Sequence, residues 1–176
     1  MIRKSLLTIA KYGYTIARNH DLGLFAMKSF TKNTVAEITG LKPRMVQCYT
    51  EQKLVTPGID NTPGRGRVRR YSELNLLEFL IIKELVGYKM TGQAIQSILW
   101  KAIDIGIVGK WWLKNSALNK ETGMYISIFK DGTVTHQHGG RAGMIDINMK
   151  NKASVITLNI SALIKQIDEK LSNLKE

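Results

Sequence analysis

The feature that most constrains this chain is a pair of short helical patterns joined by a glycine turn within residues 30–57. Val35 and Ile38 mark the inner side of the first pattern. Gly40 ends it, because glycine accepts the left-handed conformation that follows a helix. Pro43 stands in the first turn of the second pattern, where its missing N–H costs nothing. Two helices separated by a short glycine-containing turn make a helix-turn-helix unit.

The second of these helices carries side chains that can contact nucleic acid. Lys42, Arg44, Gln47 and Tyr49 offer the donor and stacking groups that contact phosphates and base edges. Tyr49 also continues the apolar side of the helix. Thr34 and Lys42 stand near the two helix N-termini, where backbone N–H groups favour anions.

A basic segment, residues 58–70, follows the two helices and predicts a loop or hairpin. Its cations are Arg65, Arg67, Arg69 and Arg70. The glycines among them lack the spacing of a dinucleotide fingerprint, and no Gly-Lys-Ser/Thr follows, so nucleotide binding is disfavoured. A basic hairpin after a helix-turn-helix is better explained as a wing, whose arginines contact the DNA backbone or minor groove.

Charge and cysteine content narrow the class of protein further. Residues 1–70 hold 13 Lys and Arg against 4 Asp and Glu, whereas residues 71–176 hold 13 against 10. This asymmetry indicates an anionic partner for the first part, with nucleic acid ahead of an acidic membrane surface. No apolar run reaches the roughly 18 residues of a membrane span. The single cysteine, Cys48, excludes an internal disulfide and a Cys₄ zinc site, and fits a reducing compartment.

Two further helical patterns follow the basic segment. Ser72 can cap the first, which ends at Gly87, and Thr91 can cap the second, which runs to about residue 105. Thr31 or Asn33 can cap the earliest helix of the chain. The expected core positions of the helix after Ser72 are Leu74, Leu77, Leu80, Ile81 and Leu85.

Residues 30–99 resemble the DNA-binding domain of the MerR family of bacterial transcription regulators, over about 70 of the 176 residues. The matching positions are Phe30-Thr31, Val35-Ala36, Thr39-Gly40-Leu41, Pro43-Arg44, Val46, Tyr49, Leu54-Val55, Pro57, Arg69-Arg70-Tyr71-Ser72, Leu74, Leu77 and Gly87-Tyr88. Where the family has Arg-Tyr-Tyr-Glu, this chain has Gln47-Cys48-Tyr49-Thr50, so only Tyr49 carries over directly. The departure concerns the preferred DNA sequence and not the mode of docking.

The resemblance implies a winged helix-turn-helix that binds double-stranded DNA as a homodimer at a palindromic operator. It further implies an effector site in the C-terminal part and, in many members, distortion of a promoter for use by RNA polymerase. The expected location is the bacterial cytoplasm, at the nucleoid. The alternative is a winged-helix adaptor that docks protein or RNA partners, supported only by the missing Arg-Tyr pair.

The region after residue 105 predicts a small antiparallel sheet. Alternating residues fill about 123–159, and Asp131-Gly132 is a hairpin signal. Residues 145–149 give one of the expected strands. Trp100, Trp111 and Trp112 are expected to pack between elements, with a ligand pocket as the alternative.

The last pattern, about residues 160–174, predicts an amphipathic helix. Its apolar seam consists of Ile160, Ile164, Ile167, Leu171 and Leu174. Lys165 and Glu169 stand one turn apart on its outer side. The seam fits dimerisation and packing on the chain's own sheet equally well.

No catalytic pattern is present, so the chain is expected not to be an enzyme and to need no cofactor. His136 and His138 share one side of an expected strand, but no cysteine or clear acidic ligand stands beside them, so a metal site is not expected. The predicted fold class is α+β. The predicted organisation is a poorly ordered extension at 1–28, a DNA-binding domain at 29–105 and an effector and dimerisation region at 106–176.

Overall fold

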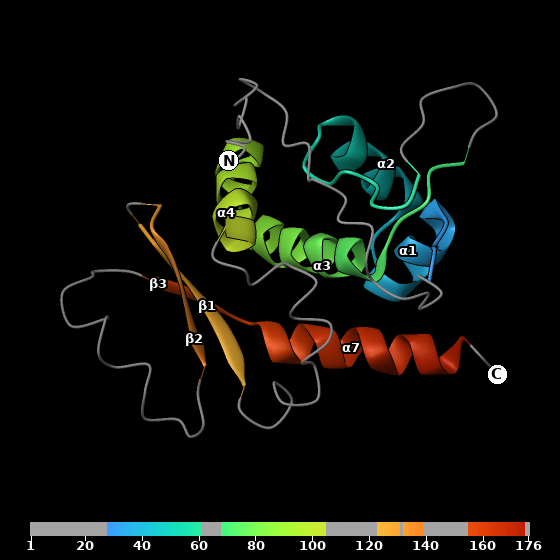
Figure 1. Cartoon of the computed structure of the whole chain (residues 1–176). Coiled ribbons are helices and arrows are strands. Elements are labelled where there is room, and N and C mark those ends of the chain that lie inside the picture. The colour runs from blue at the N-terminus through green and yellow to red at the C-terminus, as the bar shows by residue number, and fades with distance from the viewer. Residues whose placement is uncertain (1–27, 61–67, 105–122, 131, 139–154, 175–176) are drawn as a thin grey trace, which may run out of the picture.

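The computed structural model describes residues 28–60, 68–104, 123–130, 132–138 and 155–174 (Figure 1). These residues form an α+β structure of helices and one small sheet. The helices are α1 (Lys32–Thr39), α2 (Pro43–Glu51), α3 (Glu73–Gly87), α4 (Gly92–Asp104) and α7 (Ile160–Asn173). The strands are β1 (Met124–Phe129), β2 (Val134–His138) and β3 (Val155–Asn159).

The helix boundaries follow the capping residues. The Thr31 hydroxyl accepts a hydrogen bond from the backbone N–H of Thr34 at 3.3 Å, which selects Thr31 over Asn33 as the cap of α1. Gly40 ends α1 with a φ of 68°, in the left-handed region. The Thr91 hydroxyl accepts from the backbone N–H of Ala94 at 3.3 Å, at the start of α4. The predicted starts of α1 and α4 and the predicted end of α1 are confirmed.

Helix α3 lies at the centre of the molecule and is buried on almost all sides. Its buried residues include Leu76, Phe79 and Ile82 in addition to the expected positions, whereas Leu74 is only half-buried. The expected core positions are therefore confirmed except for Leu74, and the buried surface of α3 extends beyond them. The reason is tertiary, because α1, α4 and α7 all pack against α3 (Figure 1).

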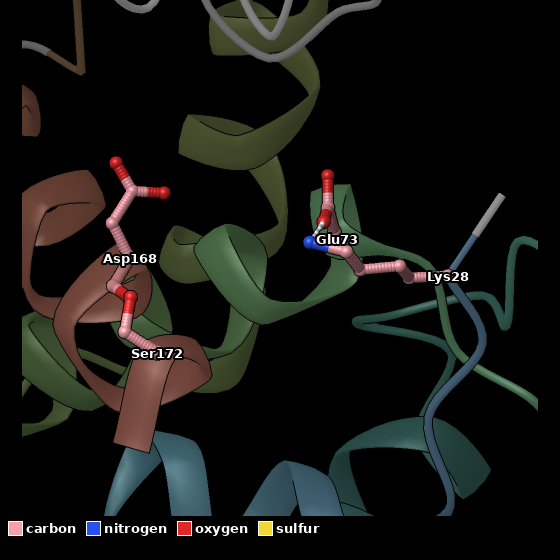
Figure 2. Close-up of polar contacts among 4 residues, drawn as sticks. All are labelled: Lys28, Glu73, Asp168 and Ser172. Carbon is pink, nitrogen blue, oxygen red and sulfur yellow. Dashed lines mark hydrogen bonds and ion pairs between the residues drawn. The ribbon is translucent and has the colours of Figure 1, made fainter. Parts of the chain in front are cut away.

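The start of α3 is fixed by polar groups at both ends of its first turn. Ser72 and Asn75 form a reciprocal capping box. Lys28 forms an ion pair with Glu73 at 3.2 Å (Figure 2). A carboxylate in the first turn is favoured by the helix dipole. Phe30 pairs with Tyr71 in an isolated antiparallel bridge, so the entry to α1 and the entry to α3 are joined.

The sheet has the strand order β2-β1-β3, and both pairings are antiparallel. The predicted hairpin joins β1 to β2, with Gly132 at a φ of 77° and its N–H donating to the Phe129 carbonyl at 2.9 Å. The expected strand at 145–149 lies outside the described residues. As the central strand, β1 is buried along both faces.

Strand β3 passes directly into α7, whose first turn is capped by the Asn159 side chain. Figure 1 shows α7 running along α3, on the side of the molecule away from α2. It contacts α3, α1 and β1. On its outer side Lys165 pairs with Glu169 at 3.9 Å, as predicted, and Ser172 donates to the Asp168 carbonyl (Figure 2).

The apolar seam of α7 is largely filled from within the chain. Ile160, Ile164 and Ile167 are buried in the core, Leu171 is half-buried and Leu174 is 43% exposed. The core they join extends from Phe30 through α3 to the sheet, on both sides of the boundary predicted at residue 105. None of the helices in the described ranges is long and apolar enough to cross a membrane.

Candidate nucleic-acid interface

The turn between α1 and α2 is held in place by α3. Lys83 on α3 donates from Nζ to the Thr39 carbonyl at 2.9 Å, at the C-terminal end of α1. A cation is favourable at this end of a helix. A Cβ at Gly40 would lie 3.1 Å from the same Nζ. Glycine is therefore favoured here both by its left-handed φ and by the lack of space for a side chain. The contact with Lys83 of α3 therefore helps to fix the turn that places α2 relative to α1.

The inner side of α2 is fixed by packing and by one buried hydroxyl pair. Val46 and Thr50 are buried, and the Thr50 hydroxyl lies 3.0 Å from the Tyr71 hydroxyl. Tyr71 in turn packs edge-on against Phe79 of α3, with ring centroids 5.6 Å apart. Because these contacts hold one side of α2 against Tyr71, which itself packs on α3, the opposite side is presented to solvent.

That outward face of α2, which consists of Lys42, Pro43, Arg44, Gln47 and Glu51, is exposed throughout. No carboxylate pairs with Lys42 or Arg44 among the described residues, so both cations remain available to an anion. The structure thus brings together three of the predicted site residues, Lys42, Arg44 and Gln47.

Gln47 is held between two charged side chains. Its Oε1 accepts from Nζ of Lys32 on α1 at 3.1 Å, and its Nε2 donates to Oε1 of Glu51 at 2.9 Å. Sequence reasoning missed both neighbours. The spacing of Gln47 and Glu51 by one helical turn was a visible signal, whereas Lys32 lies 15 residues earlier and no local pattern could place it.

Tyr49 lies on the other side of α2 and is only 6% exposed. Burial, followed by the neighbouring Cys48, raises the pKa of its hydroxyl above the usual value. This burial agrees with the apolar side expected for α2. The expected contact between Tyr49 and DNA stays a prediction. Thr34 is half-buried, and its hydroxyl lies 3.0 Å from that of Thr31 within the α1 cap.

The basic segment after α2 is described only at its two ends. Asp60 and Arg70 exchange backbone hydrogen bonds at 3.2 and 3.0 Å, which brings the ends together as an antiparallel bridge. Arg69 and Arg70 are half-buried there, and Val68 is exposed. Arg65 and Arg67 lie outside the described residues.

Asn75 ties the base of this segment to α3, a role that sequence reasoning missed. Its Oδ1 accepts from the backbone N–H groups of Gly58 and Ser72, at 2.8 and 2.9 Å. Its Nδ2 donates to the Thr56 carbonyl at 3.0 Å and to Oε2 of Glu78 at 2.7 Å. Burial raises the pKa of Glu78 to about 7, against a smaller lowering by the Asn75 hydrogen bond. A carboxyl that titrates near neutrality therefore lies under the base of the segment.

The sheet carries a row of hydroxyl side chains. Ser127 on the central strand is paired in register with Thr135 on β2 and Thr157 on β3. The hydroxyl oxygens of Ser127 and Thr135 are buried and have no hydrogen-bond partner within the part of the chain that the structure describes. Leaving such a group unsatisfied costs about 1–3 kcal/mol, so this row calls for a functional or structural explanation.

Two other expectations concern the tryptophans and histidines. Trp100 is 58% exposed, so the prediction that it packs between elements was wrong, because it stands on the solvent side of α4. Trp111 and Trp112 lie outside the described residues. His136 and His138 lie on β2. In the part of the chain that the structure describes, no three His, Cys, Asp or Glu side chains gather as a metal site would require.

Comparison with known proteins agrees with this geometry. Residues 30–101 match the model of a family described as MerR HTH family regulatory protein. No match was found among curated proteins. The matched range contains α1, α2, α3 and nearly all of α4, together with the outward face of α2. Residues 30–101 are therefore a MerR-family helix-turn-helix domain, of the type found in transcription regulators that bind DNA.

Proposed function

We propose that this protein is a sequence-specific transcription regulator that binds double-stranded DNA at a palindromic operator as a homodimer. The observation that carries the proposal is the outward face of α2, within a MerR-type domain. It combines two cations that have no carboxylate partner among the described residues with an ordered amide, on a helix whose inner side is held by packing. A major groove admits a helix of this kind, and cations on its surface neutralise phosphates.

In this proposal Arg44 and Lys42 contact the DNA from α2, and Gln47 faces a base edge. Thr34 and Lys42 stand at the N-terminal ends of α1 and α2, which favour phosphate oxygens. Tyr49 supports α2 from the core and offers its hydroxyl.

The segment between Asp60 and Arg70 acts as a wing. Arg65, Arg67, Arg69 and Arg70 neutralise phosphates beside the groove that α2 enters. The support is the backbone bridge between Asp60 and Arg70, together with the arginine content of the segment.

The dimer contact on α7, if it uses the predicted seam, falls at Leu171 and Leu174. Ile160, Ile164 and Ile167 already pack inside the chain, so they stabilise the protomer first. The exposed Leu174 is the seam position that remains for a partner.

An effector acts through the sheet and α7. The unpartnered hydroxyls of Ser127 and Thr135 give the sheet polar groups that a small molecule can satisfy. Helix α7 contacts β1 at one end and α1 and α3 along its length, and Lys101 on α4 donates to the Gly132 carbonyl in the hairpin. A change in the sheet can therefore be transmitted to the helices that position α2 in two ways, through α7 and through the hydrogen bond between Lys101 and Gly132. The regulated step is the use of a promoter by RNA polymerase, in the bacterial cytoplasm.

The test is binding of the full chain to the DNA upstream of its own gene, followed by nuclease footprinting and by anisotropy at increasing salt. We expect a symmetric footprint and a logarithm of affinity that falls linearly with the logarithm of salt concentration. Absence of any salt-dependent footprint would reject the regulator. Capture of a protein or RNA partner by the same preparation would then favour the adaptor instead.

A further inference from the structure

The contact between Gln47 and its two charged neighbours fixes the direction of the Gln47 amide. An ammonium group only donates hydrogen bonds and an ionised carboxylate only accepts them. The amide oxygen must therefore face Lys32, and the amide nitrogen must face Glu51, as the distances of 3.1 and 2.9 Å record. A rotation of the amide by half a turn would place like groups against each other on both sides.

The same contacts leave a defined pair of groups free. An amide oxygen accepts two hydrogen bonds and an amide NH₂ donates two. Lys32 takes one acceptor position and Glu51 takes one hydrogen, so one acceptor and one donor remain. The major-groove edge of adenine presents the complement, a donor at N6 and an acceptor at N7.

We propose that Gln47 recognises an adenine in the operator, and that Lys32 and Glu51 are positioning residues that hold its amide in the required direction. The inference rests on the proposed function, because it assigns the base that the outward face of α2 recognises. An exposed glutamine ordinarily loses side-chain freedom on binding. Here that freedom is already restricted in the free protein.

The charges of the two positioning residues support a role in specificity rather than in stability or affinity. Lys32 stands in the first turn of α1, which contains no acidic residue, and the helix dipole disfavours a cation there. Glu51 places a carboxylate on the surface that meets phosphates, which weakens binding to any DNA. Each of the two charges is therefore unfavourable where it stands, and positions with such unfavourable local choices are expected at functional sites. A role in orienting the Gln47 amide explains the presence of both charges.

The experiment selects binding sites from a library of random DNA duplexes with the full chain and its variants. For the wild type we expect an adenine preferred at one position of the enriched site, by roughly 5- to 150-fold. Gln47→Ala abolishes that preference. Glu51→Ala removes the oxygen that accepts from the Gln47 amide, so it reduces the preference at least several-fold while total affinity stays equal or rises. Glu84→Ala, which removes an exposed carboxylate from α3, is the matched control and leaves the preference intact.

Lys32→Ala gives a second, independent variant on the other side of the amide. It reduces the same preference, but total affinity falls because a cation is lost. All these positions lie on or near the surface, so circular dichroism checks that each variant is folded as the wild type is.

The inference is overturned if Glu51→Ala or Gln47→Ala retains the full adenine preference. In that case the wild type still enriches a site, and the proposed function stands without it. If the wild type enriches no sequence at all, the proposed function and the inference fail together, and this outcome is distinct from the first.

Discussion

Helices α2 and α7 are both short amphipathic helices, yet their polar sides differ in kind. The outward face of α2 carries cations with no carboxylate partner in the described ranges, and an amide held by a residue from another helix. The outer side of α7 carries the Lys165–Glu169 pair, which forms within a single helix and is largely exposed. The apolar sides of both helices pack in one core. Apolar spacing therefore identifies packing in both cases, whereas only polar groups ordered across two elements indicate a site.

The largest effect tests whether the seam of α7 belongs to the core of the protomer. Ile164→Ala removes buried methyl groups where α7 meets the core, and it should lower the free energy of unfolding by about 2–5 kcal/mol. Urea denaturation followed by circular dichroism measures this change, with Leu174→Ala as the exposed control. An Ile164→Ala variant that keeps wild-type stability but loses its dimer would show that the seam serves the partner instead.

A second effect tests the carboxyl of Glu78, which lies beside the base of the basic segment after α2. Because the pKa of Glu78 is raised to about 7 in the folded protein, the folded state holds the proton more tightly than the unfolded state. The stabilisation is fully present below the unfolded pKa near 4.5 and is lost as the pH rises through about 7. We expect a loss of about 1–3 kcal/mol over this window, measured by urea denaturation at several pH values.

Glu78→Gln provides the control for this pH dependence. The amide oxygen can still accept from Asn75, and the group no longer titrates. The variant should be nearly insensitive to pH over the same window and more stable than the wild type above pH 7. An unchanged slope in Glu78→Gln would assign the pH dependence to another group.

A third effect concerns the outward face of α2. Arg44→Ala should weaken DNA binding by about tenfold or more and reduce the salt slope by about one, if the guanidinium neutralises one phosphate. Fluorescence anisotropy at several salt concentrations measures both quantities. Unfolding stability should change by less than about 0.5 kcal/mol, because Arg44 is exposed and has no carboxylate partner among the described residues. Full affinity in Arg44→Ala would remove α2 from the interface.

The smallest expected effect is that of removing Lys165, on the outer side of α7. Lys165→Ala should change stability by less than about 0.5 kcal/mol, because an exposed pair of this kind contributes little. DNA affinity should change far less than in Arg44→Ala, although both variants lose one positive charge. Equal losses in the two variants would mean that net charge, rather than the face of α2, controls binding.

The sequence was sufficient where local chemistry decides the structure. Thr31, Ser72 and Thr91 mark helix starts through hydrogen bonds to a residue three positions later. Gly40 and Gly132 supply the left-handed positions at the end of α1 and in the hairpin. These features do not depend on what packs around them, so the order of helices and the turn between β1 and β2 could be predicted.

The features that the sequence did not predict depend on contacts between residues far apart in the chain. Leu76 and Phe79 are buried because three helices surround α3, and the sequence of α3 alone does not record their positions. Trp100 is exposed although its type favours burial. At the candidate site, Arg44 and Gln47 were predictable from their helix. Lys32 and the link from Asn75 to Gly58 depend on contacts across 15 and 17 residues.

The position of α7 along the chain bears on how this protein is made. On the ribosome, α1, α2 and α3 emerge well before β3 and α7, yet α7 covers part of the side of α3 that the first helices leave bare. Apolar surface exposed during synthesis favours aggregation and chaperone binding. Helices α1, α2 and α3 therefore reach their final stability only after the sheet and α7 have been translated. A nascent chain that stops short of β3 would expose to solvent the apolar surface of α3 that α7 covers in the complete fold.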